Sequence, residues 1–253
     1  MIHSPDRIKT GDVLLCQGSG LTAFILQVGI SNVYNHSGIA VRFKSIDPPV
    51  VSLTEEGELF MLEINVDDRY DRILKQQVTG ISFTDYNFML SRYNRLVYRP
   101  MREEYRCQEL ADKTLEFVRN YKDYVFPTDI ASLLGISVGF SFREPLSDNK
   151  CFCTELIAYY YPYVLKEKYK ELNGCSDADY IRMFGKSIPK SSNTIVPDSY
   201  TVEDNPHNTV LVNSTYTVYI AYSSFWPSIL FPICFTLIAL IILWLLLPGN
   251  GLY

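Results

Sequence analysis

Short apolar runs bounded by glycine, proline and polar residues alternate along the chain with stretches of helical period. Runs of strand length that are rich in β-branched residues are typical of β-strands. We therefore predict strands at residues 13–16, directly after His36, and at residues 60–65, 78–83, 96–99 and 209–222.

The longest stretch of helical period covers residues 106–121, where Leu110, Phe117 and Val118 fall near one face. Shorter helices are expected at residues 21–28, from about Phe126, from Cys153 and from about Ser176. Strands and helices thus alternate in an α+β manner, and about 200 residues are enough for one domain with a sizeable core. The sequence predicts a single domain over residues 1–222.

An uncharged, almost wholly apolar stretch runs over residues 228–247. About 20 such residues are long enough to cross a hydrocarbon layer of about 30 Å as a helix, with the alternative of a buried core helix. Trp226 and Trp244 flank or end the stretch, as interfacial anchors do. We predict a C-terminal transmembrane tail anchor over residues 223–253, and hence a single-pass protein in contact with a lipid bilayer.

Flanking charge does not orient this predicted anchor, because no lysine, arginine, aspartate or glutamate follows Asp204. Asn35, His36 and Ser37 match the glycosylation sequon, and a glycan on Asn35 would block the site described below. We therefore expect the domain to face the cytosol.

Charge and cysteine content exclude some classes of function. The net charge of −5 comes without a long basic run, which argues against nucleic acid as a partner. Six cysteines are too sparse for a disulfide scaffold, so free thiols in a reducing compartment are expected. The only histidines are His3, His36 and His207, and the sequence has neither a His-x-x-x-His pair nor a Cys-x-x-Cys motif, which argues against a tetrahedral zinc site. No metal and no cofactor is expected.

Two distant segments carry the candidate chemistry: Tyr34 to Val41 and Cys151 to Ala158. The second places Cys153 at the start of a predicted helix, where the helix dipole and unpaired N–H groups favour thiolate over thiol. His36, at the mouth of an apolar strand, can take the proton and hold the charge. Together they predict a thiol hydrolase site.

These two segments, together with Gly11-Asp12-Val13-Leu14 before them and Glu63 between them, resemble the circularly permuted NlpC-type papain-like cysteine hydrolases. That branch includes YiiX-like and lecithin:retinol acyltransferase-like proteins and relatives in large DNA viruses, and its histidine strand precedes its cysteine helix. The resemblance implies Cys153 as nucleophile, His36 as general base and Glu63 as the residue that orients the imidazole. It also implies a small antiparallel sheet packed on the cysteine helix. Ser37 departs from the family, which usually has an apolar residue there.

Each site residue also has a purely structural interpretation. Cys153 could be a small core residue, His36 a strand cap that bonds a carbonyl, and Glu63 a residue of an exposed strand face. Tyr34 could donate to an oxyanion beside the Cys153 N–H, or simply pack among the nineteen tyrosines. Cys151 offers a second thiol, for which structural or redox roles are expected.

The predicted reaction is acyl transfer through a thioester on Cys153. The substrate is a peptide amide, an isopeptide or lipid-protein bond, or the ester of a membrane lipid, and the predicted anchor favours a lipid or lipid-linked acyl group. The alternative is a structural protein of a large DNA virus virion that links the inner membrane to capsid proteins and keeps only a vestigial hydrolase fold.

Overall fold

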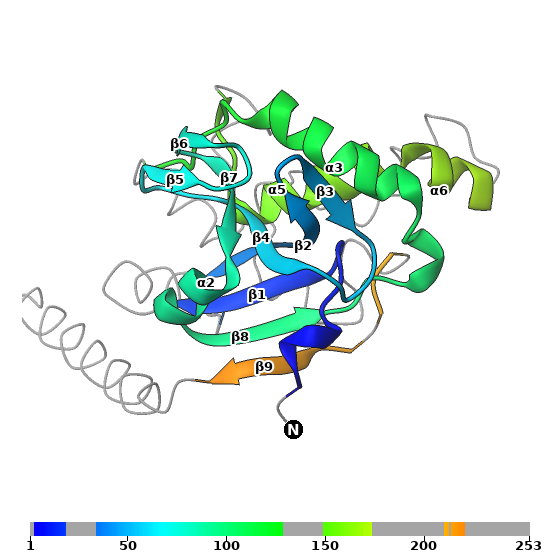
Figure 1. Ribbon diagram of the computed structural model, residues 1–253, viewed down its shortest axis with the longest axis horizontal. Coiled ribbons are helices and arrows are strands. Elements are labelled where there is room, and N and C mark those ends of the chain that lie inside the picture. The colour runs from blue at the N-terminus through cyan, green and yellow to red at the C-terminus, as the bar shows by residue number, and fades with distance from the viewer. Residues whose placement is uncertain (1–2, 19–33, 129–148, 174–209, 213, 221–253) are drawn as a thin grey trace, which may run out of the picture.

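An antiparallel sheet forms the centre of the protein in the computed structural model, which describes residues 3–18, 34–128, 149–173, 210–212 and 214–220 (Figure 1). Seven strands belong to this sheet, in the order β7-β4-β2-β1-β8-β9, with β3 paired to β2. Their bounds are β1 Val13–Gly18, β2 His36–Ile46, β3 Pro49–Ser52, β4 Glu58–Ile64, β7 Ile81–Asp85, β8 Tyr93–Arg99 and β9 Tyr216–Ile220. Strands β5 (Arg69–Asp71) and β6 (Gln76–Val78) form a separate two-stranded sheet.

Four helices are described, and the two longest pack on the sheet. The two longest, α3 (Gln108–Tyr121) and α5 (Cys153–Val164), pack on each other and on the sheet, and α6 (Lys166–Asn173) follows α5. A short helix, α2 (Tyr86–Arg92), joins β7 to β8. Two 3-10 turns, η1 (Pro5–Arg7) and η2 (Glu103–Tyr105), complete the described elements.

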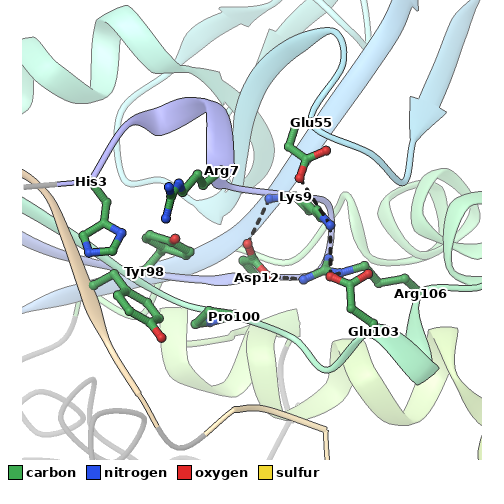
Figure 2. A pocket seen from close by; sticks show the side chains of 10 residues that line it. His3, Arg7, Lys9, Asp12, Glu55, Tyr98, Pro100, Glu103 and Arg106 are labelled. Carbon is green, nitrogen blue, oxygen red and sulfur yellow. Dashed lines mark hydrogen bonds and ion pairs between the residues drawn. The ribbon is translucent and has the colours of Figure 1, made fainter.

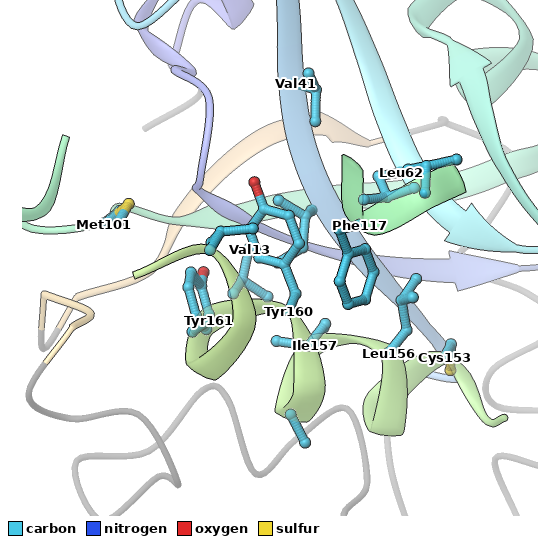
Figure 3. Close-up of a cluster of buried hydrophobic side chains, with 14 of the residues drawn as sticks. Val13, Val41, Leu62, Met101, Phe117, Cys153, Leu156, Ile157, Tyr160 and Tyr161 are labelled. Carbon is cyan, nitrogen blue, oxygen red and sulfur yellow. The ribbon is translucent and has the colours of Figure 1, made fainter. Parts of the chain in front are cut away.

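Alternation along β2 divides the core into two clusters, as the period of two requires. Ile39, Val41 and Phe43 belong to the cluster beneath α3 and α5, whereas Ala40 belongs to the cluster on the opposite face. Figure 3 shows the apolar side of α5 directed at the sheet within the first cluster. Because this face of α5 is buried, the helix start is held beside the start of β2.

Gly38 permits a close approach of β4 to β2. A Cβ atom at this position would lie 2.6 Å from the Leu62 carbonyl oxygen and 2.6 Å from Cγ of Met61. Contacts this short force neighbouring atoms to move, so a side chain at Gly38 would push β4 away. The glycine therefore keeps Glu63, the residue that follows Leu62, within reach of His36.

Most predicted strands are confirmed, with shifted bounds, as β1, β2, β4, β8 and β9. The single strand expected at residues 78–83 is wrong: the chain turns at Gly80, whose φ of 116° few other residues adopt, and the region divides into β6 and β7. The long helix is confirmed as α3 and the cysteine helix as α5. The helices predicted at residues 21–28 and from Ser176 lie outside the described residues.

The predicted fold class needs two corrections. The sheet has seven strands and is larger than the small sheet implied by the resemblance. The predicted transmembrane helix is also contradicted, because none of the helices in the described ranges is long and apolar enough to cross a membrane; residues 221–253 themselves lie outside those ranges. Length and hydropathy alone do not separate a membrane span from an apolar segment packed on protein. The single-pass membrane location inferred from that helix is corrected with it.

Replacing Gly38 with alanine should destabilise the fold by about 1–3 kcal/mol, because the added methyl group overpacks the contact between β2 and β4. Urea unfolding followed by circular dichroism measures the change. Lys44→Ala, at an exposed position of the same strand, is the control and should change stability by less than about 0.5 kcal/mol. Equal stabilities of the two variants would contradict the close approach assigned to Gly38.

Candidate active site

The candidate site forms where the start of α5 meets the start of β2. Cys153 is the first residue of α5, and His36 is the first residue of β2. Asn35 fixes the entry to β2, because its side-chain Oδ1 accepts a hydrogen bond from the Gly18 N–H at 2.8 Å and its own N–H donates to the Cys16 carbonyl at 3.1 Å. The end of β1 thereby sets the position of His36.

Strand register brings Glu63 to His36. β2 and β4 pair with Ile39 opposite Leu62, so Gly38 stands next to Glu63 and His36 is its diagonal neighbour on the same face. Nε2 of His36 lies 2.5 Å from Oε2 of Glu63. The carboxylate side chain is fully buried, whereas the imidazole is 16% exposed. Leu62 and Ile64, the neighbours of Glu63 in β4, belong to the core cluster on the other face of the sheet.

The Glu63 carboxylate has three partners besides His36. Nη2 of Arg69 lies 2.7 Å from Oε1, and the Thr84 hydroxyl donates to the same oxygen. The Tyr93 hydroxyl donates to Oε2 at 3.1 Å, and the Tyr93 ring stacks on the imidazole with centroids 5.7 Å apart. A buried carboxylate is costly unless it is paired and hydrogen-bonded, and here both oxygens are satisfied.

The Cys153 sulfur lies against His36 and Ser37. It is close enough to the imidazole and to the Ser37 backbone N–H for both to lower its pKa. The buried Ser37 hydroxyl is close enough to favour the thiolate, although it lacks the geometry of a full hydrogen bond. Because Nε2 of His36 faces Glu63, the other ring nitrogen, Nδ1, is the one available to the sulfur.

The charges of the three residues reinforce each other. Burial alone would raise the pKa of Cys153, but the adjacent His36 imidazolium lowers it. Burial would lower the pKa of His36, but the charge of Glu63 and the bond to Cys153 raise it to about 9. Burial would raise the pKa of Glu63, but His36 and Arg69 hold it at about 2. At neutral pH His36 is therefore an imidazolium and Glu63 a carboxylate, and the imidazolium favours the thiolate form of Cys153.

The other candidates have less direct positions. Tyr34 packs in the same core cluster as Cys153, with the Arg95 guanidinium 5.6 Å above its ring, and its role as an oxyanion donor stays a prediction. Cys151 is buried, with Sγ 3.2 Å from the Phe152 carbonyl oxygen.

Sequence reasoning missed the residues that support Glu63. Thr84 lies in β7 beside β4, and polar residues alternating with Ile81 and Phe83 were the available signal. Arg69 lies in a three-residue strand too short for a periodic pattern, and Tyr93 was one tyrosine among many. Only the three-dimensional structure brings these side chains together.

A polar cavity of about 350 Å³ lies at the opposite end of β1, next to Asp12 (Figure 2). Its charges are largely paired: Arg106 with Asp12, and Lys9 with Glu55 and Glu103. Asp12 also accepts the backbone N–H groups of Lys9 and Met101, so these ion pairs join the N-terminal segment to the turn after β8. The cavity is separate from the thiol site.

Within the described ranges, no group of three or more histidine, cysteine, aspartate or glutamate side chains could hold a metal ion. No family model and no curated protein matches the chain. Solved structures do match, among them one described as metalloprotein yiiX from Escherichia coli O157:H7, DUF1105, with a TM-score of 0.40 and 15% identity, over 63% of this chain and 68% of that chain.

Because the pKa of His36 is raised in the folded protein, its contribution to the free energy of unfolding decreases as the pH becomes alkaline. Its contribution is fully present below the unfolded value of 6.5 and is lost as pH rises through about 9. The difference in unfolding free energy between wild type and His36→Gln should therefore shrink by about 1–3 kcal/mol over this interval, measured by urea unfolding. Parallel pH profiles of the two proteins would contradict an imidazolium in the folded state.

Arg69→Gln should lower the reactivity of Cys153 at neutral pH. Without this cation the pKa of Glu63 rises, the imidazolium is less stabilised, and the pH midpoint of thiolate formation moves upward. Each unit of such a shift costs about tenfold in thiolate at a pH below both midpoints. Alkylation of Cys153 by iodoacetamide, followed by mass spectrometry as a function of pH, measures this midpoint.

The matched control is Arg72→Gln, which removes an exposed arginine paired with Glu58 near the same two-stranded sheet. It should leave the pH midpoint unchanged. If both variants have the same profile as wild type, Arg69 does not act through Glu63.

Proposed function

We propose that this protein is a thiol hydrolase or acyltransferase that acts on an amide or an ester through a thioester on Cys153. The observation that carries the proposal is the 2.5 Å contact between His36 and the buried Glu63 beside Cys153, with pKa directions that favour thiolate next to imidazolium. A cysteine that served only to fill the core would have its pKa raised by burial, as Cys16 does.

In the proposed reaction, the Cys153 thiolate attacks the carbonyl carbon and a carbon–sulfur bond forms. The bond to the leaving amine or alcohol breaks, and the His36 imidazolium gives its proton to that group. Water or a second acceptor then attacks the thioester, neutral His36 takes the acceptor's proton, and the thiolate is released. Glu63 stays ionised throughout and holds the imidazole in place, since its pKa of about 2 is far below that of His36.

The helix start supplies the element that an acyl transfer needs besides nucleophile and base. The oxygen of the carbonyl becomes negative during attack, and the positive end of a helix dipole stabilises such charge. Because Cys153 is the first residue of α5, its own backbone N–H lies next to the sulfur that attacks. We propose this N–H as one oxyanion donor.

Both an amide and an ester remain compatible with this chemistry. The preference for a lipid substrate rested on the predicted membrane anchor, and with that anchor contradicted it has no independent support. The leaving group is in either case one that a single imidazolium can protonate.

An activated ester tests the proposal without knowledge of the natural substrate. With p-nitrophenyl acetate, the wild type should release a burst of p-nitrophenolate and gain one acetyl group, because the thiolate forms the acyl-enzyme before deacylation. Stopped-flow absorbance and intact-mass spectrometry measure the two events. Cys153→Ala should abolish the burst, and His36→Gln should slow it by about 100-fold or more.

Cys151→Ala is the matched control, because it removes a buried thiol two residues from Cys153 while leaving the contact with His36 intact. It should keep the burst. Acetylation that persists in Cys153→Ala, or spreads evenly over the cysteines, would refute the proposed nucleophile.

A further inference from the structure

Arg95 lies at the same end of the sheet as the thiol site and on the face that α5 and Cys153 cover. It is opposite Gln17 at the end of β1, and its neighbour Val97 belongs to the core cluster beneath α5. Its guanidinium lies over the ring of Tyr34, two residues before His36, at 5.6 Å from the ring centroid. Arg95 is therefore a cation close to the start of β2.

Arg95 is half-buried, and its Nε, which is buried, has no acceptor among the described residues; Nη1 of Arg69 is in the same situation. Arg42 donates to the carbonyl oxygens of Ile8, Gly57 and Pro5, and Arg106 pairs with Asp12. A buried donor without an acceptor is costly, and a cation without an anion more so. The fold thus keeps at Arg95 a positive charge with one buried N–H that lacks an acceptor among the described residues.

We propose that Arg95 binds a carboxylate of the acyl substrate, with the Tyr34 ring as the platform on which the guanidinium rests. This inference rests on the proposed function of Cys153. A guanidinium presents two parallel N–H groups that match a carboxylate, and stacking on an aromatic ring orients that fork. The substrate class is an anionic peptide or amide.

Spacing defines where the carboxylate lies in the substrate. Two strand intervals of about 4.8 Å separate β8 from β2, so Arg95 is about 10 Å from the strand that carries His36. An extended chain advances about 3.3–3.6 Å per residue. The carboxylate recognised by Arg95 therefore lies about three residues from the carbon that Cys153 attacks, either as a free C-terminus or on an acidic side chain.

Three chloroacetyl dipeptides probe the subsite. The first probe, chloroacetyl-Gly-Gly, carries a terminal carboxylate. The second, chloroacetyl-Gly-Gly amide, carries no charge, and the third, chloroacetyl-Gly-Asp amide, carries a side-chain carboxylate. In each reaction the Cys153 thiolate forms a carbon–sulfur bond and chloride leaves with the bonding electron pair. The rate of Cys153 modification, measured by mass spectrometry at low salt, should be about tenfold or more higher for one or both anionic probes than for the neutral probe.

Arg95→Gln should remove this preference while changing the rate with the neutral probe less than twofold, and Arg95→Lys should retain part of it. Arg92→Gln is the matched control, since it removes a half-buried arginine three residues away that pairs with Asp67. If Arg92→Gln reduces the preference as much as Arg95→Gln does, the preference reflects the overall positive charge of the region, and the assignment to Arg95 is overturned. Thermal unfolding of each variant checks that the fold is kept.

The neutral probe separates this inference from the proposed function. If Cys153 reacts with the neutral amide no faster than an unfolded thiol, the proposed nucleophile fails. If Cys153 is fast but wild type shows no preference for either anionic probe, the thiol site stands and the carboxylate subsite is overturned. Preference for only the terminal or only the side-chain carboxylate identifies which of the two sources Arg95 recognises.

Discussion

The burial of one carboxylate, that of Glu63, constrains the rest of the site. Removing an ionised carboxylate from water costs several kcal/mol unless charge and hydrogen bonds replace the water. His36, Arg69, Thr84 and Tyr93 together provide that replacement, and they come from four different segments of the chain. The carboxylate is satisfied only when all four segments are in place. The charge of His36 therefore depends on the packing of β2, β5, β7 and β8 around β4.

The sequence was most informative where periodicity and local chemistry agreed. The apolar run around Glu63 predicted a strand, now β4, and the start of a helical run predicted Cys153 at a helix terminus. These are local properties, which a single sequence contains. The register that places Gly38 against Leu62 is not local, and it determines whether Glu63 reaches His36 at all.

The failures have physical causes as well. Arg69 lies in a three-residue strand, and nothing in its sequence neighbours indicates a partner six residues back across a turn. The division of residues 76–85 into two strands depends on the positive φ of Gly80, which an apolar count does not register. The transmembrane prediction used length and hydropathy alone, and neither property states whether an apolar segment meets lipid or protein.

Two buried carboxylates of this fold show why a charge pair alone does not indicate catalysis. Asp12 faces Arg106 and two backbone N–H groups, so all of its partners are fixed donors that do not release a proton at physiological pH. Glu63 faces Arg69 in the same way, but its second oxygen meets His36, which is partly exposed and contacts a thiol. Only the latter arrangement contains a group that gains and loses a proton between a buried charge and a nucleophile. The presence of the titratable His36, rather than of a buried acid, distinguishes the candidate active site from the structural ion pair at the other end of β1.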